Sequence, residues 1–108
     1  MVKTETLFAK LKKKGLREKM LEVCVGNDIG FMAIFGSFVR GEESRKSDID
    51  VAIEFTDKNR KTFFDLIHIE EELKKMFGRK VDLGIFSAIN PHIIEDVKKE
   101  MLVIYEKR

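Results

Sequence analysis

The chain has 108 residues, of which 44% are hydrophobic and 37% are charged, which suits one compact core beneath a densely ionic surface. Its 21 basic and 19 acidic residues leave a formal net charge of +2, too small an excess to predict a nucleic-acid-binding protein. No apolar run approaches the ~20 residues that cross a bilayer, and the N-terminus lacks the apolar segment of a signal peptide. We therefore expect a cytoplasmic protein with one domain over residues 1–108 and no membrane partner.

The first part of the chain, from Thr4 to Val25, predicts helix. Apolar residues recur at helical spacing in two stripes, and Gly15 between them allows either two helices or one bent helix. The only cysteine, Cys24, excludes an intrachain disulfide and is expected to be a small buried thiol. The glycine-flanked segment 26–30 has turn chemistry and should end the helix.

Two strands are predicted next. Phe31–Phe35 is a short continuous apolar run bounded by glycines, which is typical of a strand buried on both faces. Residues 36–47 are polar and are expected to form a loop or a short helical turn. Residues 48–55 then alternate strictly, with Ile49, Val51, Ile53 and Phe55 on one face and Asp48, Asp50, Ala52 and Glu54 on the other.

A second helix is predicted after a polar connection over residues 56–61. Thr62 and Asp65 resemble a capping box at its start, and Gly78 stands at the expected C-cap. Its predicted apolar stripe consists of Phe63, Leu66, Ile67, Leu73 and Phe77. At least one of the neighbouring aromatics Phe63 and Phe64 is expected in the core, because a small domain needs its aromatic side chains inside.

The last part of the chain predicts a strand, a helix and a final short strand. Residues 80–86 read as the third strand, and Asn90 and Pro91 as the N-cap and first residue of a helix that continues to Met101. Residues 102–105 are expected to form the last strand. The fold class is therefore α/β (α+β), with a small mixed sheet of three to four strands and helices packed against it. His68 and His92 are expected at the surface.

Asp48 and Asp50 are the first candidates for chemistry. Residues two apart on a strand project to the same face, so their carboxylates should lie close together. Close like charges repel unless something compensates, and Mg²⁺ is often bound by one or two carboxylates together with substrate phosphates. The pair fits a metal clamp, but solvated or capping aspartates at a strand edge have the same pattern.

Gly36-Ser37 and Asp82 extend this candidate site. Glycine allows close backbone approach to a ligand and serine adds a hydroxyl, so Gly36-Ser37 after a buried strand could hold phosphate oxygens or could be an ordinary turn. Asp82 interrupts an apolar strand, which is unfavourable unless it is paired or ligating. If its strand lies beside residues 48–55, three carboxylates converge and could hold two metal ions; otherwise Asp82 is a solvated aspartate.

Gly36-Ser37, ten intervening residues and then Asp48-Ile49-Asp50 resemble the signature of the DNA polymerase β-like nucleotidyltransferase superfamily. The wider string GSFVRGEESRKSDIDV is similar to its minimal nucleotidyltransferase branch, whose members are often encoded beside a HEPN-domain partner as toxin–antitoxin pairs. The resemblance spans residues 31–86 and the preceding helix. It implies a polymerase β-like nucleotidyltransferase core.

The resemblance also implies roles for individual residues. Gly36 and Ser37 would hold the phosphates of ATP or another NTP, and Asp48 and Asp50 would bind two Mg²⁺ ions. Asp82 would complete the metal site and help to activate the acceptor hydroxyl. Two further residues would support the phosphate-binding loop: Arg40, which either neutralises phosphate charge or pairs with Glu42 or Glu43, and Ser47, which orients the loop by local hydrogen bonding.

The activity that the resemblance implies is metal-dependent transfer of AMP from ATP to a hydroxyl on a HEPN-type protein partner, by analogy with the branch a tyrosine hydroxyl. Two alternatives stay open: an antitoxin that acts by binding alone, with vestigial catalysis, and a nucleotidyltransferase that acts on a small molecule. The sequence has no segment that matches the acceptor-binding domain of larger relatives, and it leaves the oligomeric state open.

Overall fold

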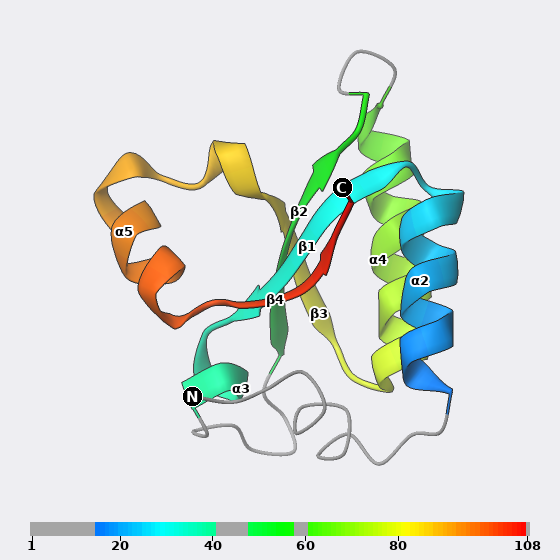
Figure 1. The fold of residues 1–108 in the computed structure, drawn as a ribbon, viewed down its shortest axis with the longest axis horizontal. Helices are drawn as coiled ribbons and strands as arrows, with labels where there is room; N and C mark the ends of the chain where they lie inside the picture. The colour runs from blue at the N-terminus through cyan, green and yellow to red at the C-terminus, as the bar shows by residue number, and fades with distance from the viewer. Residues whose placement is uncertain (1–14, 41–47, 58–60, 108) are drawn as a thin grey trace.

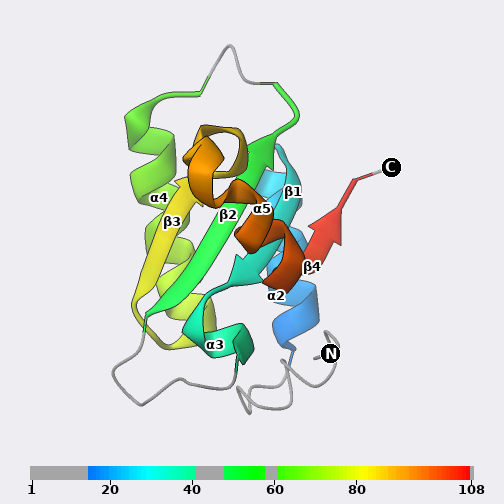
Figure 2. The ribbon, with the colours of Figure 1, turned by 90° about the vertical axis from the view of Figure 1, so that its left-hand side faces the viewer.

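The computed structural model describes residues 15–40, 48–57 and 61–107. A four-stranded mixed sheet with the order β3-β2-β1-β4 forms the middle layer, as Figure 1 shows. The strands are β1 (Ile29–Phe35), β2 (Ile49–Phe55), β3 (Val81–Ile85) and β4 (Leu102–Glu106). Helices α2 (Leu16–Gly26) and α4 (Phe63–Phe77) cover one face, and α5 (Pro91–Glu100) lies on the other side (Figures 1 and 2). The predicted fold class is confirmed.

The direction of the strands determines which chain segments meet. β1 is antiparallel to both β2 and β4, whereas β2 and β3 are parallel and are connected through α4. The end of β1 therefore lies beside the start of β2, with Phe35 opposite Asp50. The start of β3 lies on the other side of β2. Residues 35–40, 48–50 and 80–82 are thus neighbours at one end of the sheet.

The core lies between the sheet and helices α2 and α4. On β2, the predicted apolar face is fully buried at Ile49, Val51 and Ile53, and Ala52 on the opposite face is buried as well. Leu73 of α4 packs in this core without measurable exposure. The predicted buried thiol is confirmed: Cys24 is fully buried, and burial raises its pKa to about 12.

The ends of α4 follow the expected capping chemistry. The Thr62 N–H donates to the Asp65 carboxylate at 2.7 Å, which lowers the pKa of Asp65. At the other end, Gly78 has a φ of 69° and its N–H donates to the Lys74 carbonyl at 2.8 Å. Only glycine adopts this left-handed conformation readily, so the residue ends the helix as predicted. The Asn90 side chain likewise accepts from the His92 N–H and caps α5.

Several boundaries differ from those predicted. Helix α2 continues through Gly26 and β1 already begins at Ile29, because Asn27 and Asp28 complete the turn, Asp28 with a φ of 57°. Met101 is the C-cap of α5 and not part of the helix, and Phe86 begins the 3-10 helix η2 (Phe86–Ala88) after β3. Residues 4–14 of the first predicted helix lie outside the described residues.

The prediction that Phe63 or Phe64 belongs to the core is wrong. Phe63 is 73% exposed and Phe64 is 80% exposed, and Ile67 is also an exposed position. The buried positions of α4 are Ile69, Leu73, Met76 and Phe77. Phe63 and Phe64 lie in the first turn of α4, before its first buried residue, Ile69, and Phe63 lines a surface pocket with Phe55 and Ile85. In the described part of the chain, no helix is long and apolar enough to cross a membrane.

Replacing Leu73 by alanine should lower the free energy of unfolding by about 2–5 kcal/mol, because the side chain is fully buried and its removal leaves a cavity. Ile67→Ala on the same helix is the matched control, since Ile67 is 42% exposed, and it should cost less than about 1 kcal/mol. Chemical denaturation followed by circular dichroism measures both. Equal losses would contradict the described packing of α4.

Candidate active site

The starts of β2 and β3 bring two of the predicted aspartates together. The parallel register places Asp50 directly opposite Asp82, and Ile49 opposite Val81. The Ile49 N–H donates to the Lys80 carbonyl at 2.9 Å, which fixes this register at the first residue of the strand. Paired residues on neighbouring strands point to the same face of the sheet at a strand spacing of about 4.8 Å. Asp50 and Asp82 therefore lie side by side on the face that carries α5.

Asp50 is the electrostatic centre of the group. It is half-buried, whereas Asp48 and Asp82 are exposed. Partial burial raises the pKa of Asp50 above its usual value, and the negative charges of Asp82 and Asp48 raise it further. The Arg40 guanidinium opposes this effect, and a fourth carboxylate, that of Glu100, adds to it. The concentration of negative charge is unfavourable for the folded protein when no cation is present.

The donor set suits a hard divalent cation, because all three predicted ligands are carboxylates. The described residues nevertheless contain no group of three or more His, Cys, Asp or Glu side chains already arranged around one metal position. The aspartates interact electrostatically, but their oxygens do not converge on a single point. The residue types nevertheless fit a hard divalent cation, and Asp48 and Asp82 are exposed beside the half-buried Asp50.

Gly36 forms the wall of the site opposite Asp50. It follows β1 with a φ of 81°, and a Cβ built on it would lie 2.0 Å from Oδ2 of Asp50. No side chain fits in that space, and the left-handed backbone is itself strained for any residue but glycine. The sequence assigned this glycine to phosphate binding. The structure gives it a further role, because its backbone packs against the Asp50 carboxylate.

The residues that follow Gly36 form the short helix α3 (Ser37–Arg40), which Figure 2 shows at the end of β1. This agrees with the predicted loop or helical turn. Arg40 contacts Glu100 at the end of α5, with Nη1 3.0 Å from Oε2. Glu42, Glu43 and Ser47, which the sequence proposed as partners or supports of this segment, lie outside the described residues.

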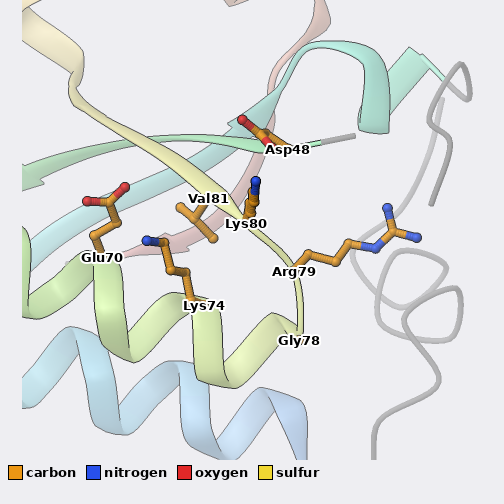
Figure 3. A pocket seen from close by; sticks show the side chains of 7 residues that line it. All are labelled: Asp48, Glu70, Lys74, Gly78, Arg79, Lys80 and Val81. Carbon is orange, nitrogen blue, oxygen red and sulfur yellow. The ribbon is translucent and has the colours of Figure 1, made fainter. Parts of the chain in front are cut away.

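A pocket of about 730 Å³ flanks Asp48 on its other side, between α4 and the start of β3. Figure 3 shows Lys80 directly beside Asp48, with Lys74 and Glu70 projecting from α4 toward the strands and Arg79 directed away from them. Lys74 Nζ also lies 3.3 Å from Oε1 of Glu71 on the same helix. Three cationic side chains thus line this pocket together with the carboxylates of Asp48 and Glu70.

Glu100 is the residue of this site that sequence reasoning missed. Its Oε1 accepts a hydrogen bond from the Gly36 N–H at 3.1 Å and another from Arg40 Nη1 at 3.1 Å. Glu100 is 64 residues from Gly36 in the sequence, and no local pattern links the two. The only available signal was an acidic residue in the last turn of a helix, where the helix dipole disfavours negative charge.

The chain belongs to the family described as polymerase beta, nucleotidyltransferase, whose model matches residues 18–108. It is 30% identical over 92 residues to the protein adenylyltransferase MntA of Thermococcus cleftensis, which covers 85% of this chain and 84% of that protein. The chain is therefore a nucleotidyltransferase by family. The matched residues include every described member of the site.

Solved structures give the same fold. A minimal nucleotidyltransferase structure with 28% sequence identity superposes with a TM-score of 0.69 and covers 94% of this chain and 95% of that chain. A second structure contains a tri-AMPylated HEPN toxin of Shewanella oneidensis in complex with an MNT antitoxin. It matches with a TM-score of 0.61 at 16% identity, over 85% of this chain and 71% of that chain. The second likeness concerns the fold alone. The predicted resemblance to the minimal nucleotidyltransferases is confirmed.

Gly36→Ala should destabilise the protein by about 1–3 kcal/mol, because the methyl group clashes with Asp50 and the backbone is left-handed. Gly84→Ala is the matched control. Gly84 lies on the same face of β3 as Asp82, and a Cβ there meets nothing within 4 Å. Its free energy of unfolding should stay within about 0.5 kcal/mol of wild type. A tolerated Gly36→Ala substitution would show that the turn is not packed against Asp50.

Asp50→Asn should stabilise the metal-free protein at neutral pH. A raised pKa means that the folded state retains the Asp50 proton at pH values where the unfolded chain has lost it, so stability falls as pH rises through that window. The asparagine variant avoids this loss. Its advantage should disappear under acidic conditions, where Asp50 is protonated in both states.

The measurement is the free energy of unfolding against pH in the presence of EDTA. Asp96→Asn, at an exposed position of α5, controls for the loss of one negative charge. A stability difference for Asp50→Asn that is the same at every pH would contradict the assigned electrostatics.

Proposed function

We propose that this protein transfers AMP from ATP to a hydroxyl group of a HEPN-type protein partner, and that it is the antitoxin of a toxin–antitoxin pair. The observation that carries the proposal is the parallel pairing of Asp50 with Asp82 beside the Gly36 turn. The names of its relatives support the type of transfer and of partner: one is a protein adenylyltransferase, and one structural neighbour contains an AMPylated HEPN toxin.

The proposed reaction is an in-line displacement at the α-phosphorus of ATP. A bond forms between the acceptor oxygen and the α-phosphorus, while the bond from that phosphorus to the bridging oxygen breaks and pyrophosphate leaves with the electron pair. Asp82 accepts the proton of the acceptor hydroxyl. Bound Mg²⁺ would supply neutralisation of the triphosphate and a lower pKa of that hydroxyl.

The other residues bind and orient the nucleotide in this proposal. Asp48 and Asp50 hold two Mg²⁺ ions, and Gly36, Ser37 and Arg40 hold phosphate oxygens, with Ser47 supporting the loop. The cationic side chains beside Asp48 attract the polyphosphate toward the metal ligands. The raised pKa of Asp50 supports this assignment, because a divalent cation is the group that would relieve the repulsion among these carboxylates.

We also expect the protein to act in the cytoplasm and without a nucleic-acid substrate. The nearly balanced charge of the chain supports the second expectation, since binding through phosphates requires an excess of clustered Lys and Arg. The proposed site is compatible with a monomer or a homo-oligomer, which size-exclusion chromatography distinguishes.

The double substitution Asp48→Asn and Asp50→Asn should lower AMP transfer by at least about 10³-fold, because metal-assisted charge stabilisation is worth several kcal/mol. The assay incubates purified protein, Mg²⁺ and labelled ATP with the product of the neighbouring gene, which the proposal expects to be a HEPN-domain protein, and follows label on that product. EDTA should abolish transfer by the wild type, whereas the control Asp96→Asn should retain it.

The same variant distinguishes the catalytic proposal from neutralisation by binding alone. If the variant still binds the partner but no longer protects cells from it, neutralisation requires the chemistry. Full protection by the variant would contradict the proposal. Failure of the wild-type protein to label the partner from any nucleotide tested would contradict it as well. Label on a small-molecule acceptor in place of the partner would favour the remaining alternative.

A further inference from the structure

Glu100, at the end of α5, contacts the segment from Gly36 to Arg40, which lies 60 to 64 residues away in the sequence. One of its oxygens accepts from the Gly36 N–H at 3.1 Å, and both oxygens lie 3.0–3.1 Å from Arg40 Nη1. Its side chain is 28% exposed, so the contact is partly shielded from solvent. The same carboxylate thus holds the glycine that packs against Asp50 and the arginine proposed to bind phosphate.

The position of Glu100 is unfavourable for the helix that carries it. Glu100 is the last residue of α5, where the carbonyl ends of the helix disfavour an acidic side chain. Lys98 and Lys99 in the same turn have the charge that the dipole favours. The compensation for Glu100 therefore comes from outside α5, through the Gly36 N–H and Arg40. Glu100 therefore stabilises the positions of Gly36 and Arg40 and does not stabilise its own helix.

We propose that Glu100 is a positioning residue for nucleotide transfer: it holds the Gly36 turn against Asp50 and directs the Arg40 guanidinium toward the phosphates. The proposal rests on the proposed function, since it concerns the same nucleotide site. It makes the end of α5 part of that site, although α5 itself contributes no other residue to it. A carboxylate that anchors Arg40 reduces the number of orientations that the long side chain samples, so less entropy is lost when phosphate binds.

The test compares Glu100→Gln with Glu95→Gln in the full chain, using ATP and the partner protein. Glutamine keeps the shape of Glu100 and an oxygen for the Gly36 N–H but loses the charge that holds Arg40. Glu95 is a matched control on the same helix, with a 75% exposed side chain that lies 3.7 Å from Lys98. We expect Glu100→Gln to raise the KM for ATP and to lower kcat/KM by about tenfold, with Glu95→Gln unchanged.

A double-substitution cycle with Arg40→Ala adds a readout that a merely structural role would not affect. If Glu100 acts through Arg40, Glu100→Gln should have little further effect on kcat/KM in the Arg40→Ala background. A structural role alone would reduce the folded fraction and leave the KM for ATP unchanged.

Two results would overturn this inference when the wild-type protein transfers AMP. One is identical KM and kcat for both glutamine variants, and the other is that the effects of Glu100→Gln and Arg40→Ala multiply in the double variant. A wild-type protein that neither binds ATP nor transfers AMP would overturn the proposed function, and the inference with it. The two failures are therefore distinguishable from the wild-type measurement.

Discussion

The site depends on the parallel pairing of β2 with β3, which places Asp50 opposite Asp82. The hydrogen bond from the Ile49 N–H to the Lys80 carbonyl sets this register at the first residue of β2. A shift by one residue would turn Asp50 into the apolar core and bring Ile49 to the polar face, so the buried face of β2 enforces the alignment. The same packing that stabilises the fold therefore positions the carboxylates.

Repulsion among carboxylates is the electrostatic consequence of this register. Asp50 is partly buried next to Asp82 and Asp48, and its pKa is raised accordingly. Gly36 closes the other side, because the Asp50 carboxylate occupies the space that a side chain at position 36 would need. The fold thus holds acidic groups together at a cost to its own stability, as is common at sites that bind a cation. In a nucleotidyltransferase, the opposing charge is expected to come from metal ions and from the cationic residues around the nucleotide.

Much of the fold could be predicted from the sequence because its local signals were strong. Strict alternation in β2 predicted the buried face, and Thr62 and Gly78 marked the ends of α4. The aromatic residue Phe63 was misplaced because hydrophobicity favoured burial, whereas its position in the first turn of α4, before the first buried residue Ile69, leaves it at the margin of the core. The start of β1 was predicted two residues late because Asn27 and Asp28 complete the turn within two residues.

The site was predictable to the extent that its members are neighbours on a strand or match a family motif. Asp48 and Asp50 were found from strand periodicity, and Asp82 from its unfavourable position in an apolar strand. Glu100 could not be found in this way, because it reaches Gly36 and Arg40 only after α5 has folded back across the sheet. Contacts across 60 or more residues leave no periodic signal in a single sequence.

Paramagnetic broadening by Mn²⁺ in the presence of ATP tests most directly whether these carboxylates form a metal–nucleotide site. With the wild-type protein, the amide signals of Gly36, Asp50 and Asp82 should broaden most strongly, and the broadening should decrease along the same two strands toward Phe55 and Ile85, while Mg²⁺ should broaden neither set. Broadening centred on Phe55 and Ile85, or no broadening at millimolar Mn²⁺ with ATP, would contradict the account.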